Sequence, residues 1–286
     1  MKLKYATKLF ICVNVLTVAF RTLQIIFMTE SGTQFLKDSF KVISIIGTVV
    51  SVLALALLFA NCACAVRQPE KVNCRGISAT VASVLSGILY LVSGILAATG
   101  QQLGWQIILI LSLSVTAACV LMAVSAATER VFPKGIAIAF LVYWLAELVL
   151  SYLSYIERAL RVRTVYEVLA VCFVLLFSIT FGKAVSSVDS EKNFRRIYPL
   201  GLTACSLCIL SVVPEVIAKI LGFADKVSQS AISPVALVAA AVFTGFFTIN
   251  TFKKSNTVHP KAKKRRAAGA LQQPSSGSQQ DFFSEL

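Results

Sequence analysis

Residues 42–66 read VISIIGTVVSVLALALLFANCACAV, 25 positions without a single Asp, Glu, Lys or Arg. A helix of about 20 apolar residues is long enough to cross the hydrocarbon core of a bilayer. Backbone N–H and C=O groups find no water in that core, so such a segment satisfies them internally by forming a helix. The stretch therefore predicts a transmembrane helix.

Similar apolar stretches fill most of the chain. Hydrophobic residues make up 57% of the 286 residues and charged residues 14%, whereas soluble domains contain about 25% charged residues. A soluble enzyme of this size could not cover so much apolar surface, which excludes that class. We predict an all-α fold, a polytopic membrane bundle of eight transmembrane helices. The seven other spans are expected at 9–28, 77–99, 104–128, 135–155, 165–183, 199–222 and 232–252.

The distribution of Lys and Arg predicts the orientation of these spans. With eight crossings, both termini and the second, fourth and sixth loops share one side, and that side carries 19 of the 27 cations, against six on the other. Short cytoplasmic loops are enriched in Lys and Arg. We therefore expect an integral protein of the plasma (inner) membrane with its N- and C-termini in the cytoplasm.

Two alternatives concern the organisation of the chain. Residues 1–20 have the basic start and apolar run of a signal peptide, but the small-residue cleavage site that should follow is poor. A shift of 121 residues aligns the charged residues of 70–75 with those of 191–196, which would make the bundle a 4+4 parallel repeat. Two ordinary basic loops at similar spacing explain the second pattern equally well.

The last 34 residues differ from the transmembrane domain, residues 1–252. Residues 253–286 are basic and then rich in Gly, Ser, Gln and Pro, a composition typical of a disordered cytoplasmic tail. Cations just inside a membrane attract anionic lipid headgroups. A membrane or cytoplasmic protein partner is an alternative, whereas no folded nucleic-acid-binding module accompanies the run. The residues expected to contact lipid headgroups are Lys261, Lys263, Lys264, Arg265 and Arg266.

Ionisable side chains inside the spans are the candidate functional residues, because each costs about 2.5–3.5 kcal/mol to insert and usually faces the bundle interior. We identify Arg21, Glu147, Glu215 and Lys219. At about 1.5 Å per residue from the cytoplasmic end, Arg21 and Glu147 lie about 18 Å deep, and the other two deeper still. They indicate a pocket open to the outside that binds a solute or an ion. The alternative is an ion pair that only fixes packing, such as Arg21 with Glu147.

Motifs for other chemistry are sparse. His259 in the tail is the single histidine, and no phosphate-binding loop or dinucleotide fingerprint occurs. Cys62, Cys64 and Cys74 are candidates for a soft metal, although three thiols in a reducing compartment more often stay free. We therefore expect no cofactor and no metal, and the sequence argues against an enzyme without excluding one.

The sequence favours a small-solute transporter or a permease-like subunit, of unidentified solute. The alternative is a non-transporting membrane sensor or assembly component that acts through its basic loops and tail.

Overall fold

The computed structural model describes residues 3–30, 36–65, 77–100, 104–128, 135–156, 162–186, 190–227 and 232–255. It is built almost entirely from helices, whose order is α1 (Leu3–Leu23), α2 (Lys41–Ala65), α3 (Ile77–Thr99), α4 (Trp105–Ala127), α5 (Ile136–Ile156), α6 (Val162–Val185), α7 (Ser190–Ile220) and α8 (Pro234–Ser255). The all-helical fold and each predicted apolar segment are thus confirmed as helix.

Seven of these helices, α1 to α7, are long and apolar enough to cross a membrane. The apolar part of α8 is shorter, Pro234–Asn250, so the prediction of an eighth span is not confirmed by length and composition. The 4+4 parallel repeat is not confirmed either, and it stays a prediction.

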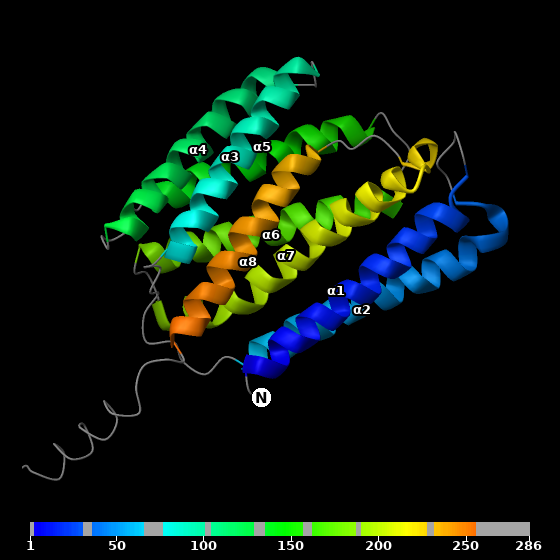
Figure 1. The fold of residues 1–286 in the computed structure, drawn as a ribbon, viewed down its shortest axis with the longest axis horizontal. Helices are drawn as coiled ribbons and strands as arrows, with labels where there is room; N and C mark the ends of the chain where they lie inside the picture. Colours follow the sequence, from blue (N-terminus) through cyan, green and yellow to red (C-terminus); the bar gives the residue numbers. More distant parts are fainter. Residues whose placement is uncertain are drawn as a thin grey trace, which may run out of the picture.

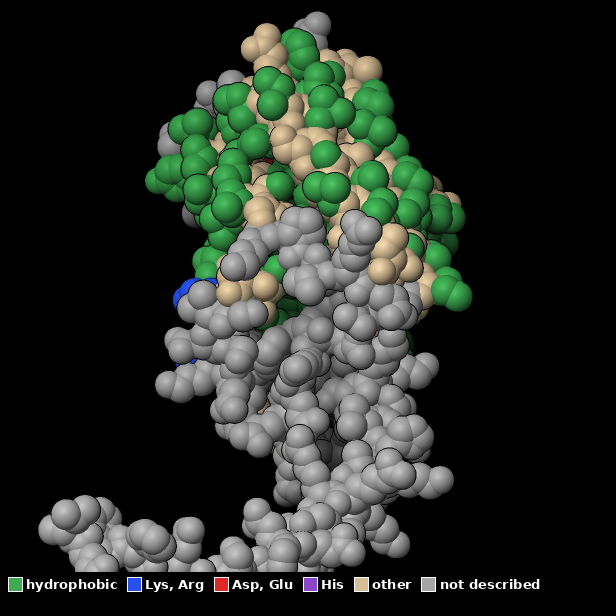
Figure 2. Space-filling model, turned by 90° about the vertical axis from the view of Figure 1, so that its left-hand side faces the viewer, with side chains coloured by type: hydrophobic (Ala, Val, Ile, Leu, Met, Phe, Trp, Pro, Cys, Tyr) green, Lys and Arg blue, Asp and Glu red, His purple; other side chains and the backbone are tan. Residues whose placement is uncertain are grey.

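The polarity of the bundle is that of a multi-pass membrane protein. On α2, large aliphatic side chains such as Val42, Val50 and Leu57 are more than half exposed, whereas Ser44 and Ser51 are buried. Figure 2 shows one face on which hydrophobic side chains cover most of the described surface. Apolar surface on this scale does not stay exposed to water.

α7 is the central helix of the bundle. In its apolar segment 72% of the residues are buried, against 22 to 44% in α1 to α6. It packs against α1, α2, α6 and α8, while α3 pairs with α4 on the far side and contacts α8. Figure 1 shows α1 and α2 side by side along one flank of the molecule. A site formed between helices therefore has α7 as one wall.

The helix that contains the seventh span begins earlier than the predicted span. The span was expected from residue 199, close to the apolar segment Arg196–Ile220, but α7 begins at Ser190 and continues through Pro199 and Pro214. Proline removes one backbone donor and disfavours a helix interior in water. Tertiary packing on several sides of α7 outweighs that preference, because Ile197, Tyr198 and Leu202 are all buried.

Candidate functional site

The polar residues that interrupt the first apolar stretch lie on one buried face of α1 and of the π-helical turn that follows it, Gln24–Met28. Asn14, Thr17, Arg21 and Gln24 recur at helical spacing, and each is at most 8% exposed. The Thr17 hydroxyl donates to the Val13 carbonyl at 2.7 Å. Exposing these groups to lipid would be costly, so the helix turns them toward the bundle. The segment least typical of a membrane span thus forms a wall of the interior.

The contacts between α1 and α7 fix the register of the two helices. Asn14 Nδ2 donates to Ser206 Oγ at 2.9 Å, and one turn beyond Arg21, Ile25 and Ile26 pack with Ala218. Both contacts join residues about 192 apart, so the helices run parallel. Arg21 is therefore level with residue 213, about 3 Å along the axis from Glu215 at 1.5 Å per residue.

Arg21 links three elements at the end of α1. Its guanidinium donates to Gln24 Oε1 and lies over the Tyr166 ring of α6, with Cζ 5.3 Å from the ring centroid. Gln24 Nε2 in turn donates to Ser44 Oγ and, at 3.3 Å, to Thr48 Oγ1 of α2. Gln24 opens a π-helical turn, Gln24–Met28. Such turns are rare and often occur at functional sites.

Glu167 is a buried carboxylate that the sequence interpretation missed. It is 1% exposed, next to Tyr166 on α6. The signal was present, since residue 167 lies inside the predicted span 165–183. A Cβ on Gly201 of α7 would lie 3.0 Å from Phe177, which places Glu167 level with about residue 211. Glu167 and Glu215 therefore lie on either side of Arg21 along the axis, within about 6 Å.

Lys219 and Glu215 have different surroundings, although they are spaced as a helical ion pair. Glu215 is buried and Lys219 is exposed. Among the described residues, the buried Arg, Lys, Asp and Glu side chains are therefore one base, Arg21, and three acids, Glu147, Glu167 and Glu215. The described part of the interior thus carries more acidic than basic side chains.

Glu147 belongs to a separate aromatic cluster between α3 and α5. The Tyr143 hydroxyl donates to Glu147 Oε1 at 2.9 Å, and Trp144 Nε1 donates to the Tyr90 hydroxyl at 3.1 Å. The Tyr90 and Tyr143 rings pack edge to face, with centroids 5.2 Å apart. These rings fill the space around the carboxylate. Glu147 thus accepts a hydrogen bond within its own helix, from a tyrosine that packs against Tyr90 of α3.

Glu147 and Arg21 do not lie at the equal depth estimated from the sequence. A Cβ on Gly182 of α6 would lie 2.9 Å from Ala137 of α5, so Glu147 is level with about residue 172. Residue 172 lies six residues, about 9 Å, closer to the C-terminal end of α6 than Tyr166, the residue that Arg21 covers. Arg21 and Glu147 contact different side chains, as described above. Along the helix axis, Arg21 lies closer to Glu215 than to Glu147.

A cavity of about 190 Å³ lies between α2, α6 and α7. Its walls are apolar side chains such as Leu55, Leu169 and Leu207, together with the Thr203 side chain. Thr203 is 2% exposed, and its Oγ1 has no hydrogen-bond partner. At one end Phe59 and Phe173 meet edge to face, with centroids 6.3 Å apart.

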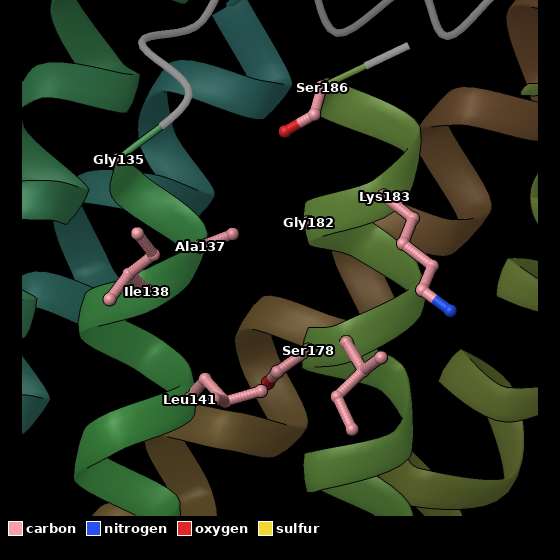
Figure 3. A pocket seen from close by; sticks show the side chains of 9 residues that line it. Gly135, Ala137, Ile138, Leu141, Ser178, Gly182, Lys183 and Ser186 are labelled. Carbon is pink, nitrogen blue, oxygen red and sulfur yellow. The ribbon is translucent and has the colours of Figure 1, made fainter. Parts of the chain in front are cut away.

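A second hollow of about 410 Å³ separates the start of α5 from the end of α6. Figure 3 shows Ala137 and Leu141 on one side and Ser178 and Gly182 on the other, with the Lys183 side chain directed away from the gap. The Ser178 hydroxyl donates a hydrogen bond to the Val174 carbonyl at 2.8 Å. No charged group faces this hollow from the residues that line it, so it offers less chemistry than the first cavity.

Two further predictions concern residues that the sequence predicts to be cytoplasmic. Lys261, Lys263, Lys264, Arg265 and Arg266 lie outside the described residues, as does Cys74 of the candidate metal set. Cys62 is buried and Cys64 exposed near the end of α2. Within the described part of the chain, no group of three His, Cys, Asp or Glu is placed to hold a metal.

Comparison of the chain with protein-family models, with curated proteins and with solved structures finds no match.

Proposed function

We propose that the protein is a small-solute transporter, or the permease subunit of one, whose charged interior opens to the outside of the cell. One observation carries this proposal: among the described residues, the bundle buries one guanidinium and three carboxylates. Each costs about 2.5–3.5 kcal/mol to insert. A single ion pair would fix helix packing, whereas the additional carboxylates suit a path for a polar solute.

An eighth span completes this arrangement. α8 has 22 residues, about 33 Å at 1.5 Å per residue, which matches a hydrocarbon core of about 30 Å. It lies along α3 and α7. The start of α1 and the end of α8 lie at the same end of the bundle in Figure 1, as an even number of crossings requires.

The cation distribution puts that end in the cytoplasm of a plasma (inner) membrane protein, because 19 of the 27 Lys and Arg residues then face inward. In this orientation Arg21, Glu167 and Glu215 lie in the outer half of the membrane, near the turn where Lys226 Nζ donates to the Ile26 carbonyl at 2.5 Å. Solute would enter from that side.

A thermal-shift screen of the purified protein against metabolites, ions and lipids tests the proposal. We expect a solute that stabilises the wild type and the exposed-site variant Lys219→Gln, but fails to stabilise Glu215→Gln. The same solute should accumulate in proteoliposomes that contain the wild type. A stabilising ligand that is never transported would contradict the transporter function.

The alternative function, a sensor or assembly component, predicts a different response to truncation. Deletion of residues 256–286 should leave the flux of a transporter within about twofold of the full chain, because the deleted residues lie beyond α8. Loss of all cellular function with flux unchanged would instead favour a component that acts through its tail.

A further inference from the structure

One buried hydroxyl of α7 makes no hydrogen bond within the described structure. Thr203 is 2% exposed, and its Oγ1 has neither a donor nor an acceptor there. Thr180 and Thr244, which are also buried, each donate to the carbonyl four residues earlier in their own helix, at 2.8 and 2.7 Å. A buried hydroxyl without a partner costs free energy. A molecule that reaches Thr203 can therefore gain a hydrogen bond that the described chain does not use.

The Thr203 side chain borders the cavity between α2, α6 and α7. The volume of this cavity is about 190 Å³, and a cavity of about 150 Å³ lined by aliphatic and aromatic side chains is large enough to bind benzene. Apart from Thr203, the lining residues are all apolar: Val52, Leu55, Ala56, Phe59, Leu169, Phe173 and Leu207. The space therefore suits one small ring or a short alkyl chain, with a single polar group placed against Thr203.

The lining of the cavity favours an uncharged ligand. None of the residues that border it carries a charge. An ion inside it would lose its hydration shell, and no lining side chain would replace the lost interactions with a counter-charge. A hydroxyl group is neutral and can both donate and accept, so an alcohol or a phenol can pair with the Thr203 hydroxyl in either direction.

The cavity borders the surface that faces lipid. Ala56 on the α2 wall is exposed, and its neighbours Leu53 and Leu57 are each more than half exposed. Apolar surface of this kind marks contact with a membrane. Phe59 of α2 and Phe173 of α6 meet edge to face beside the same opening. A ligand of this site would therefore dissolve in the membrane first and enter between α2 and α6.

We infer that this cavity binds a small lipophilic alcohol or phenol, a neutral molecule whose hydroxyl pairs with Thr203 Oγ1 and whose ring or short alkyl chain fills the space between α2, α6 and α7. The site is separate from the buried charges, because Thr203 lies about eight residues, or about 12 Å, along the axis from the level of Glu167. The inference goes beyond the proposed transport function and does not depend on it.

A comparison of phenol with toluene tests the hydrogen bond, because the two molecules have nearly the same shape and differ in the hydroxyl. Binding to the full-length protein in nanodiscs is measured by equilibrium dialysis, with the ligand taken up by empty nanodiscs of the same lipid subtracted. Thr203→Val keeps the shape of the side chain and removes its hydroxyl. We expect this change to weaken phenol binding about fivefold and to leave toluene binding within about twofold of the wild type.

Thr244→Val is the matched control, because the Thr244 hydroxyl is bonded within α8 and does not border the cavity. Phenol should bind this variant as it binds the wild type. The inference is overturned if phenol shows no saturable binding, or if Thr203→Val changes the affinities for phenol and toluene by the same factor. Benzoate or benzylammonium binding as tightly as phenol would also overturn it, since ions should be excluded.

A change in the size of the cavity locates the ligand independently of Thr203. Leu169→Ala removes part of the α6 wall and leaves additional volume. We expect the affinity for 2-naphthol relative to phenol to rise at least tenfold. Leu111→Ala makes the same truncation on α4, outside the cavity, and should leave this ratio unchanged. A ratio in Leu169→Ala equal to that of the wild type would show that phenol binds elsewhere.

Flux measurements keep this inference apart from the proposed function. If phenol binds and responds to Thr203→Val but no solute is transported, the transport proposal fails and the binding site stands. If a solute is transported and phenol does not bind, the binding site fails and the transport function stands.

Discussion

Arg21 is the residue on which the interior electrostatics depend most. It is the sole cation among the buried ionisable side chains of the described chain, and it joins α1 to α6 through the Tyr166 ring and to α2 through Gln24. Its position inside an apolar stretch was sufficient to predict Arg21 as a candidate functional residue. The partners come from helices far away in the chain, which no spacing along α1 could have indicated.

Replacing Arg21 with Met should destabilise the protein by about 3 kcal/mol, because buried carboxylates would lose a nearby compensating charge. Arg21→Lys should lose less, since the charge is kept while the planar guanidinium is not. Thermal unfolding in nanodiscs measures both. The matched control, Lys219→Met, changes an exposed cation and should stay within about 0.5 kcal/mol of wild type. An Arg21→Met protein as stable as that control would contradict this role.

Glu147 offers a second test at single-residue resolution. Tyr143→Phe keeps the ring and removes the hydroxyl that donates to Glu147, so it should cost about 1–3 kcal/mol. In a Glu147→Leu background the same change should cost less, because the carboxylate acceptor is gone. Equal effects in the two backgrounds, from a double-mutant cycle, would show that the hydrogen bond contributes nothing.

The distinction between a functional and a structural Glu147 follows from Glu147→Gln. If transport is lost while the folding yield is kept, the carboxylate acts on a solute or a proton. If only the yield falls, its role is packing. The position of Glu147, about 9 Å from the Arg21 level along the axis, favours a role distinct from that of Glu167 and Glu215.

At the scale of the helix, the sequence predicted where each element lies but not how it packs. Apolar length alone was sufficient to locate the segments, because a stretch such as residues 42–66 can satisfy its backbone groups in a bilayer only by forming a helix. The start of α7 at Ser190 was missed, since Pro199 and the charged residues before it are typical of a loop in isolation. Glu167 was missed because it lies two residues inside the end of a predicted span.

Close packing of α7 depends on Gly201. A Cβ at this position would collide with Thr248 Oγ1 of α8 and lie 3.0 Å from Phe177 of α6. Gly201→Ala should therefore cost about 1–3 kcal/mol through overpacking. Gly135→Ala is the control, because a Cβ there meets nothing within 4 Å. The melting temperatures of the two variants provide the measurement, and equal values would argue against tight α6–α7–α8 packing.

At the scale of the whole molecule, the bundle reverses the polarity of a soluble protein. Leu57 and Val50 lie on its outside, and Arg21, Gln24 and Glu215 on its inside. Composition was sufficient to predict a membrane bundle. Which helices enclose the polar interior could not be predicted, because helix association in lipid depends on packing and interhelical hydrogen bonds such as Asn14 to Ser206.

The central claim is that lipid surrounds this bundle and that the end of the bundle with Arg21, Glu167 and Glu215 faces the outside. Two reporter fusions test it most directly: green fluorescent protein after Leu286, and alkaline phosphatase after Lys226 between α7 and α8. The account predicts a fluorescent first fusion and an active second one, with the tail in the cytosol and the Lys226 turn outside. A dark fluorescent-protein fusion at Leu286, or an inactive phosphatase fusion at Lys226, would contradict the account.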